Sequence, residues 1–99
     1  MNVTFTARHF NASEDLKEYA HEAVDKLSNF FDQISSIEIL LEPSQDVSKP
    51  QKAEIKVHVP QKFLTSTIES QTYEQAIHDA VDNLSRQLKR YKEKRFSKH

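Results

Sequence analysis

The apolar residues of this 99-residue chain switch between two periods, and the order of the switches limits the folds open to it. Two segments repeat apolar residues every three or four positions, as amphipathic helices do, and four segments alternate with a period of two, as half-buried strands do. Their order is strand, helix, three strands, helix. Each element has one apolar face to bury, and a four-stranded sheet with two helices on one face buries them all. The sequence therefore predicts an α+β two-layer sandwich of β-α-β-β-β-α order.

The predicted strands span residues 3–8, 34–41, 53–59 and 63–69. Pro43 ends the second strand because proline lacks the donor that a sheet needs, and residues 60–62 form a short turn between the last two strands. The polar side chains of the first three strands are expected on the water-facing side of the sheet: Thr4, Thr6, Arg8, Glu38, Glu42, Glu54, Lys56 and His58.

The first predicted helix begins after Ser13, whose hydroxyl suits the N-cap, and its apolar stripe runs from Leu16 to Phe31 over about 18 residues. Residues 70–72 can open the second helix, whose stripe begins at Tyr73. This stripe reaches Leu88 and then Tyr91. Tyrosines at these stripe positions indicate packing rather than platforms for stacking bases.

Length and composition indicate one domain over residues 1–99 in the cytoplasm. No apolar run approaches the roughly 18–20 residues that span a bilayer, and the first residues do not resemble a signal peptide. The chain has no cysteine, which excludes disulfides and thiolate zinc sites. It also has no glycine, which excludes the glycine-rich phosphate loops and the nucleophile elbow.

Positive charge is concentrated at the carboxyl end. The chain has 14 Lys and Arg against 15 Asp and Glu; residues 86–99 hold seven of the former and one of the latter, which leaves seven against fourteen in front of them. The seven are Arg86, Lys89, Arg90, Lys92, Lys94, Arg95 and Lys98. Cations stabilise a helix carboxyl end by ~0.3–1 kcal/mol each, so a purely structural role is one interpretation. A phosphate-binding ridge on the outer side of the second helix is the other.

No catalytic or metal-binding constellation is recognisable. The five histidines lack the spacing of a helical metal site, and no serine has the surroundings of a nucleophile. An enzyme and a metal or cofactor site are therefore not expected. A free-standing double-stranded-RNA-binding module and a regulatory protein-interaction domain stay open as alternatives, although the acidic outer face of the first helix (Glu14, Glu18, Glu22 and Asp25) disfavours the former.

Three stretches together resemble a known family. They are YEQAIHDAVDNLSRQLKRYKEK from Tyr73, KAEIKVHVP from Lys52, and the earlier pair TARHF and VDKLSNFFDQI. In this order they resemble the ribosome hibernation promoting factor and ribosome-associated inhibitor A family of bacteria and plastids, once labelled sigma-factor modulation proteins. The resemblance covers essentially the whole chain.

The resemblance implies a fold similar to double-stranded-RNA-binding domains and a protein that binds the small ribosomal subunit. It implies binding at the decoding channel, where messenger RNA and the A- and P-site transfer RNAs would lie, so that ribosomes are stored inactive when growth stops. The positions that match basic residues of the family pattern, and so imply contacts with ribosomal RNA, are Arg8, Lys26, Arg86, Lys89, Arg90, Lys92 and Lys94.

The chain departs from the family pattern at several positions. Ala23, Asn29, Gln33 and Asn83 stand where relatives usually carry lysine or arginine, which predicts an RNA contact shifted toward the carboxyl end. By length the chain resembles a short form without the C-terminal dimerisation domain. Short forms can act with a separate small partner that pairs ribosomes. Off the ribosome we expect a monomer.

Overall fold

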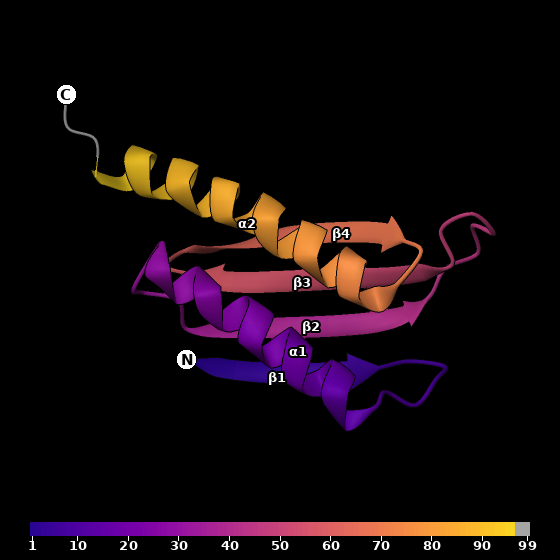
Figure 1. Ribbon diagram of the computed structural model, residues 1–99. Helices are drawn as coiled ribbons and strands as arrows, with labels where there is room; N and C mark the ends of the chain where they lie inside the picture. The colour runs from indigo at the N-terminus through magenta and orange to yellow at the C-terminus, as the bar shows by residue number, and fades with distance from the viewer. Residues whose placement is uncertain (97–99) are drawn as a thin grey trace.

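The computed structural model describes residues 1–96 and has the predicted order of elements (Figure 1). The elements are β1 (Asn2–Ala7), α1 (Glu14–Asp25), the short 3₁₀ helix η1 (Lys26–Asn29), β2 (Ser36–Pro43), β3 (Gln51–Val59), β4 (Lys62–Ser70) and α2 (Tyr73–Phe96). Over these residues, neither helix combines the length and the apolar character that crossing a bilayer requires.

The strands form one mixed sheet in the order β1-β2-β3-β4. β1 pairs with β2 in parallel, because α1 crosses over between them, and the other two pairings are antiparallel. Phe5 lies opposite Ile39 and Ile39 opposite Ile55, so the alternating apolar residues share one face. Both helices cover this face, which confirms the predicted two-layer α+β sandwich (Figure 1).

The core lies between the two layers. Val24 and Leu27 from the first helical segment and Ile77 and Leu84 from α2 are fully buried against Ile55 and its neighbours on the sheet. Such side chains stabilise a fold by roughly 1.5–3 kcal/mol each when removed from water. The apolar stripes of both helices therefore decide how each helix is rotated, and so which side chains face outward.

The first helix is shorter than its stripe predicted. Its α-helical part ends at Asp25, and the chain tightens into η1 before Phe31. The Ser28 hydroxyl donates to the Asp25 carbonyl (2.8 Å), and Phe30 N–H bonds the Leu27 carbonyl. Such local bonds favour a tight final turn. Leu27 and Phe31 still reach the core, which is why the periodicity continued through residues that are not α-helical.

Both helix starts have the capping residues that the sequence predicts. The Ser13 hydroxyl accepts from Leu16 N–H (3.0 Å), and the Thr72 hydroxyl accepts from Gln75 N–H (3.1 Å).

In the turn between β3 and β4, Gln61 has φ 71°. This left-handed conformation is usually left to glycine, and a chain without glycine must place another residue there.

The two helices run in the same direction across the sheet, so their carboxyl ends lie at the same end of the molecule (Figure 1). α2 extends beyond the strands at that end. Its last fully buried side chain is Leu88, and residues 92–95 are exposed. This shared end, with the turn between β3 and β4, positions the candidate site.

Candidate nucleic-acid interface

The carboxyl half of α2 presents a cluster of exposed cations. All lie on the helix in the part of the chain that the structure describes: Arg86, Lys89, Arg90, Lys92, Lys94 and Arg95. The seventh basic residue of the carboxyl end, Lys98, lies outside the described residues. Residues 92–95, beyond the last residue that packs on the core (Tyr91), are all exposed, so the end of α2 can carry charge on every side.

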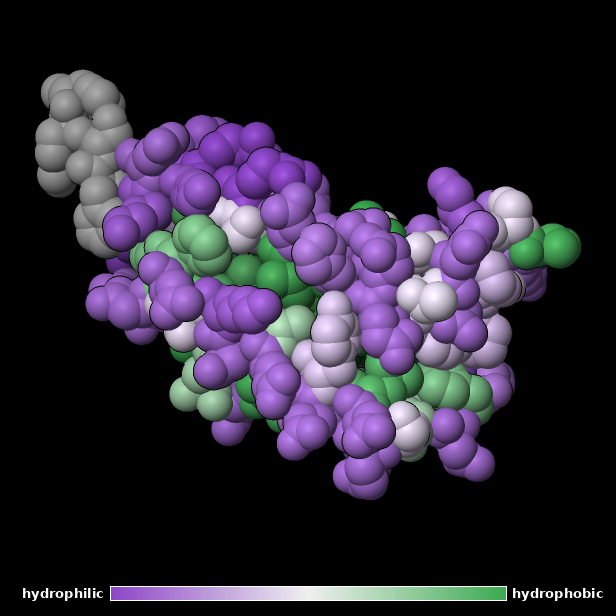
Figure 2. All heavy atoms as spheres, in the orientation of Figure 1, coloured by the Kyte–Doolittle hydropathy of each residue, from purple (hydrophilic) through white to green (hydrophobic). Residues whose placement is uncertain are grey.

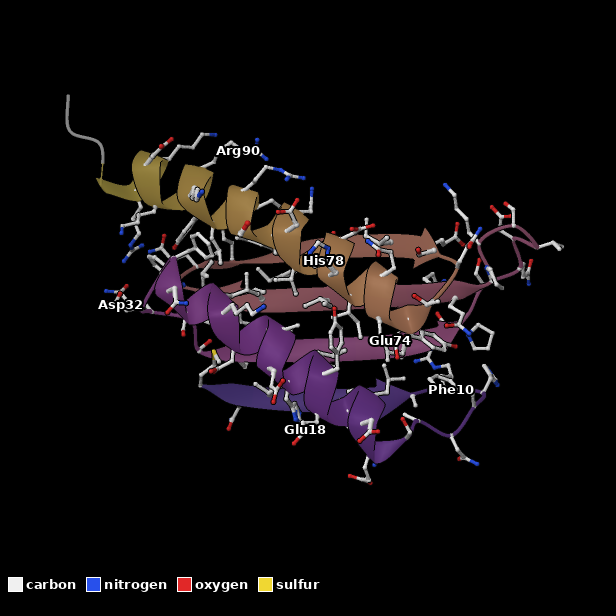
Figure 3. The ribbon with its side chains drawn as sticks, viewed as in Figure 1. Phe10, Glu18, Asp32, Glu74, His78 and Arg90 are labelled. Atoms are coloured by element: carbon white, nitrogen blue, oxygen red, sulfur yellow. The ribbon has the colours of Figure 1, made fainter. Side chains whose placement is uncertain are left out.

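The cations fan out around the helix instead of forming one ridge. Lys89 points toward the end of η1, where its Nζ lies 5.2 Å from the centre of the Phe30 ring. Arg86 faces outward and pairs with Asp82 one turn earlier (2.5 Å). Arg90 points away from α1, as Figure 3 shows, and lies with Lys94 beside the start of β4. A phosphate backbone can therefore contact this end from several directions.

Lys26 lies across a groove from α2. The groove runs between the two helices, has a volume of about 260 Å³, and includes Lys26 and Phe30 on one wall and Asp82 and Ser85 on the other. Figure 2 shows apolar side chains at the floor of this region and hydrophilic ones around it. Phe30 thus links the two lysines: it lines the groove with Lys26, and Lys89 lies over its ring.

The sequence analysis missed Lys62. This residue follows the turn after β3, and it lines a hollow of about 260 Å³ together with Arg90 and Lys94. Its Nζ lies 5.8 Å from the centre of the Tyr91 ring. No local sequence pattern marks Lys62, because its place beside α2 depends on where the carboxyl end of this helix lies relative to the sheet.

Arg8 does not belong to this cluster. It lies on the opposite, solvent-facing side of the sheet, as its alternation with Ala7 predicted, and its guanidinium pairs with Glu42 (3.6 Å). Glu42 also pairs with Lys52 (3.2 Å), so this charge is shared within the sheet. Arg8 is therefore separated by the sheet from the basic end of the helices.

The four departures from the family pattern lie near the basic end without adding charge. Asn29 and Gln33 are exposed around the end of η1. Ala23 is buried at the floor of the groove, with 8% of its surface exposed. Asn83 lines the hollow with Lys62 and Arg90. The positive charge of this end therefore comes from α2, Lys26 and the turn before β4.

The remaining charge makes the molecule asymmetric. Glu14, Glu18 and Glu22 follow the outer side of α1 and line a shallow surface on which Lys17 is the one lysine or arginine. Within residues 1–96, no three His, Cys, Asp or Glu side chains are grouped so that they could hold a metal ion. What the arrangement can do chemically is bind anions at one end and repel them along α1.

The family model described as Sigma 54 modulation protein / S30EA ribosomal protein matches residues 3–95. A ribosome hibernation promoting factor of Pseudomonas putida is 27% identical over 97 residues, which covers 98% of this chain and 92% of that protein. One of Azotobacter vinelandii is 28% identical over 99 residues, with 99% and 89% covered. The matches cover the candidate interface together with the core.

Solved structures agree with the fold. The N-terminal domain of Thermus thermophilus Protein Y superposes with a TM-score of 0.79 at 25% identity, and the match covers 92% of this chain and 99% of that one. A ribosomal subunit interface protein from Coxiella burnetii gives a TM-score of 0.83 at 21% identity, with 93% and 98% covered. At this identity the second likeness concerns the fold alone.

Proposed function

The chain belongs to the Sigma 54 modulation protein / S30EA ribosomal protein family, and from this premise we propose that it is a ribosome hibernation factor that binds the small ribosomal subunit. The family match supports the resemblance seen in the sequence. The names of the curated relatives, ribosome hibernation promoting factors, supply the biological role. Because its target is the ribosome, the protein acts in the cytoplasm.

The proposed mechanism is occupancy. The folded domain docks its basic end on ribosomal RNA phosphates in the decoding channel and takes the space that messenger RNA and the A- and P-site transfer RNAs need. No bond is made or broken in this step. The body of the domain, with its rigid two-layer core, supplies the steric block, and the cations supply the attachment.

One observation carries this proposal: cations from three separate parts of the chain meet at one end of the molecule. They are Lys26 from η1, Lys62 from the start of β4, and the cluster on α2. Helix dipoles account for cations at helix carboxyl ends, which include the α2 cluster and also Lys26, the C-cap residue of α1. They do not account for Lys62 on β4, nor for the meeting of both helix ends at one end of the sheet, which the fold decides. Convergence from several elements is what a phosphate-binding surface requires.

The RNA contact is expected to use Lys26, Arg86, Lys89, Arg90, Lys92 and Lys94, with Lys62 added. Arg8 is not included in this contact, because it faces the other side of the sheet. We further propose that the protein is monomeric off the ribosome, and that pairing of ribosomes, where it occurs, depends on a separate small partner protein.

Cosedimentation with purified small subunits at rising salt tests the proposal. Saturable binding that messenger RNA and initiator transfer RNA displace is the expected result, because all three compete for one channel. Binding that these competitors leave unchanged would place the protein elsewhere on the subunit.

The same assay separates the remaining alternatives. Retention of a plain RNA duplex at the salt concentration where subunits bind would favour a general double-stranded-RNA-binding module. No binding to either, with recovery of a polymerase subunit in a pull-down, would favour a regulatory protein-interaction domain. The acidic outer side of α1 argues against the duplex binder, because it would repel the phosphates of a duplex that lies along this helix.

A further inference from the structure

We propose that the hollow between α2 and the start of β4 is a phosphate site in its own right. Its lining consists of Lys62 and Leu64 from β4, together with residues of α2: Asn83, Gln87, Arg90, Tyr91 and Lys94. Where the phosphate belongs to ribosomal RNA, the inference rests on the function proposed above. Where it belongs to a free phosphate compound, the inference stands alone.

The charge of the lining is of one sign. Three cations, Lys62, Arg90 and Lys94, converge on the hollow from two elements, and no carboxylate lines it. Among residues 1–96, none of the three is paired with an acidic side chain, in contrast to Arg86 with Asp82. Like charges held together without a counterion repel one another, and an anion between them relieves that repulsion.

Of the two amide side chains in the lining, Gln87 is held by the protein and leaves Asn83 with a free donor. Gln87 Nε2 donates to the Thr65 carbonyl (3.1 Å) and to Asn83 Oδ1 (2.7 Å). This second bond leaves the Asn83 NH₂ group turned away from Gln87, and within the described residues that NH₂ group has no acceptor. The hollow therefore combines three cations with a free neutral donor, a combination that suits phosphate oxygens.

The floor of the hollow is firmly held. The Tyr91 hydroxyl donates to the Pro60 carbonyl (2.8 Å), which ties α2 to the turn that carries Lys62. The Tyr91 ring packs edge-on against Phe31. The distance between Lys62 and the α2 cations is thus set by packed side chains rather than by a loose loop.

The size of the hollow limits the occupant. Pockets that enclose drug-sized ligands have volumes of roughly 300–1,000 Å³, and this one is smaller, at about 260 Å³, and open to solvent. It suits one or two phosphate groups rather than a whole nucleotide. RNA backbone and free pyrophosphate compounds offer that chemistry equally, so a test must separate them.

The first arm of the test uses inorganic pyrophosphate and the ¹⁵N-labelled full chain at constant ionic strength. Saturable shifts of the Asn83 and Gln87 side-chain NH₂ signals are expected. The variant Lys62→Gln should bind pyrophosphate about three- to tenfold more weakly. Lys49→Gln makes the same change of charge in the loop between β2 and β3, at the other end of the sheet, and should bind as the wild type does.

The second arm measures the affinity of the same variants for small subunits. If the occupant is RNA backbone, Lys62→Gln binds subunits about three- to tenfold more weakly than Lys49→Gln, even without measurable pyrophosphate binding. If it is a free compound, pyrophosphate binding alone depends on Lys62. Either result supports the site. Equal behaviour of the two variants in both arms overturns it.

The two arms also keep this inference separate from the proposed function. A chain that binds pyrophosphate through Lys62 but does not bind subunits would overturn the proposed function and support the site. A chain that binds subunits with full competition by messenger RNA, while Lys62→Gln matches Lys49→Gln in both arms, would overturn the site and the Lys62 contact but not the proposed role on the ribosome. Unchanged melting temperatures of both variants confirm that the fold is intact, as expected for exposed positions.

Discussion

Arg86 and Arg90 lie about one turn apart on α2, and their surroundings differ. Arg86 pairs with Asp82 (2.5 Å) on the outer side of the helix, whereas Arg90 lies with Lys62 and Lys94 in the hollow. An exposed pair of this kind is worth only about 0.2–1 kcal/mol, yet a phosphate must compete with it. Arg90 therefore offers its charge to RNA at a lower cost than Arg86.

Replacing these arginines should change the salt dependence of subunit binding. Arg90→Gln should lower the slope of log affinity against log salt by roughly 0.7–1, as expected for one lost phosphate contact. Arg86→Gln should weaken binding less, because it also frees Asp82. Cosedimentation at several salt concentrations measures both. Equal slopes for the wild type and the Arg86/Arg90 double variant would show that neither arginine contacts phosphate.

Tyr73 provides a test of stability against pH. Burial raises the pKa of its phenol above the usual 10.0, and the charge of Glu42 raises it further. The folded state thus favours the neutral phenol, so its contribution to stability is complete below pH 10 and is lost as pH rises through the higher folded pKa. Tyr73→Phe keeps the ring stacked on Phe10 and removes the ionisable group.

Urea unfolding at pH 8 and above pH 10 checks this expectation. The free energy of unfolding should fall more steeply with pH for the wild type than for Tyr73→Phe, because all other titrating groups are common to both. Parallel curves for the two proteins would mean that ionisation of Tyr73 does not depend on folding.

At the residue scale, the sequence identified most of the basic end and missed part of it. Helical periodicity was enough to place Arg86 and Lys89 outside the core of α2. Lys62 was missed because its position depends on where α2 ends relative to the sheet, which is a tertiary distance. Arg8 was included through the family pattern, although strand alternation had already placed it on the other face of the sheet.

At the scale of elements, local chemistry decides where the helices begin and end. Ser13 caps α1 through Leu16 N–H, and the sequence predicted this cap because serine is among the preferred residues there. The carboxyl end of α1 was predicted less well. Leu27 and Phe31 suit both an α-helix and the tighter η1 that the chain adopts, so apolar spacing alone could not separate the two.

The cap makes a measurable contribution. Ser13→Ala removes the acceptor for Leu16 N–H and should lower the free energy of unfolding by about 1 kcal/mol. Ser28→Ala is a suitable control, because the Ser28 hydroxyl donates to the Asp25 carbonyl at the end of α1 and does not accept from an unpaired helix N–H. Thermal or urea unfolding of both variants gives the comparison. Equal losses for the two would indicate that the cap adds nothing specific.

A substitution in the turn between β3 and β4 should increase stability, whereas loss of the Ser13 cap should decrease it. Gln61 has φ 71°, which costs a residue with a side chain about 1–2 kcal/mol. Gln61→Gly relieves this strain. It also increases the conformational entropy of the unfolded chain, which lowers the free energy of unfolding by about 0.4–1 kcal/mol. A net stabilisation of about 0.5 kcal/mol is expected from urea unfolding. A clear destabilisation would mean that the Gln61 side chain stabilises the fold by more than its backbone strain costs.

At the scale of the whole molecule, the fold gathers positive charge at one end of a chain whose net charge is close to zero. The domain measures 48 × 25 × 19 Å along its principal axes, and both helices end at the same end of its sheet (Figure 1). The order of elements was predictable from apolar periods alone. The gathering of Lys26, Lys62 and the α2 cations was not, because it depends on the direction in which each helix crosses the sheet.

This polarity predicts an orientation on the ribosome, and the absence of cysteine allows a direct test. An iron chelate that generates hydroxyl radicals can be tethered to a single introduced cysteine, either at Asn29→Cys beside the basic end or at Val47→Cys, a position 93% exposed in the loop between β2 and β3. Both variants should first be shown to bind subunits as the wild type does.

Mapping the cleaved nucleotides of small-subunit RNA is the measurement that tests the central claim most directly. Cleavage from position 29 is expected to be strong and to fall on the RNA that lines the decoding channel, with weaker cleavage from position 47. Stronger cleavage from position 47, or cleavage from position 29 that falls outside the decoding channel, would contradict the proposal that the basic end docks there.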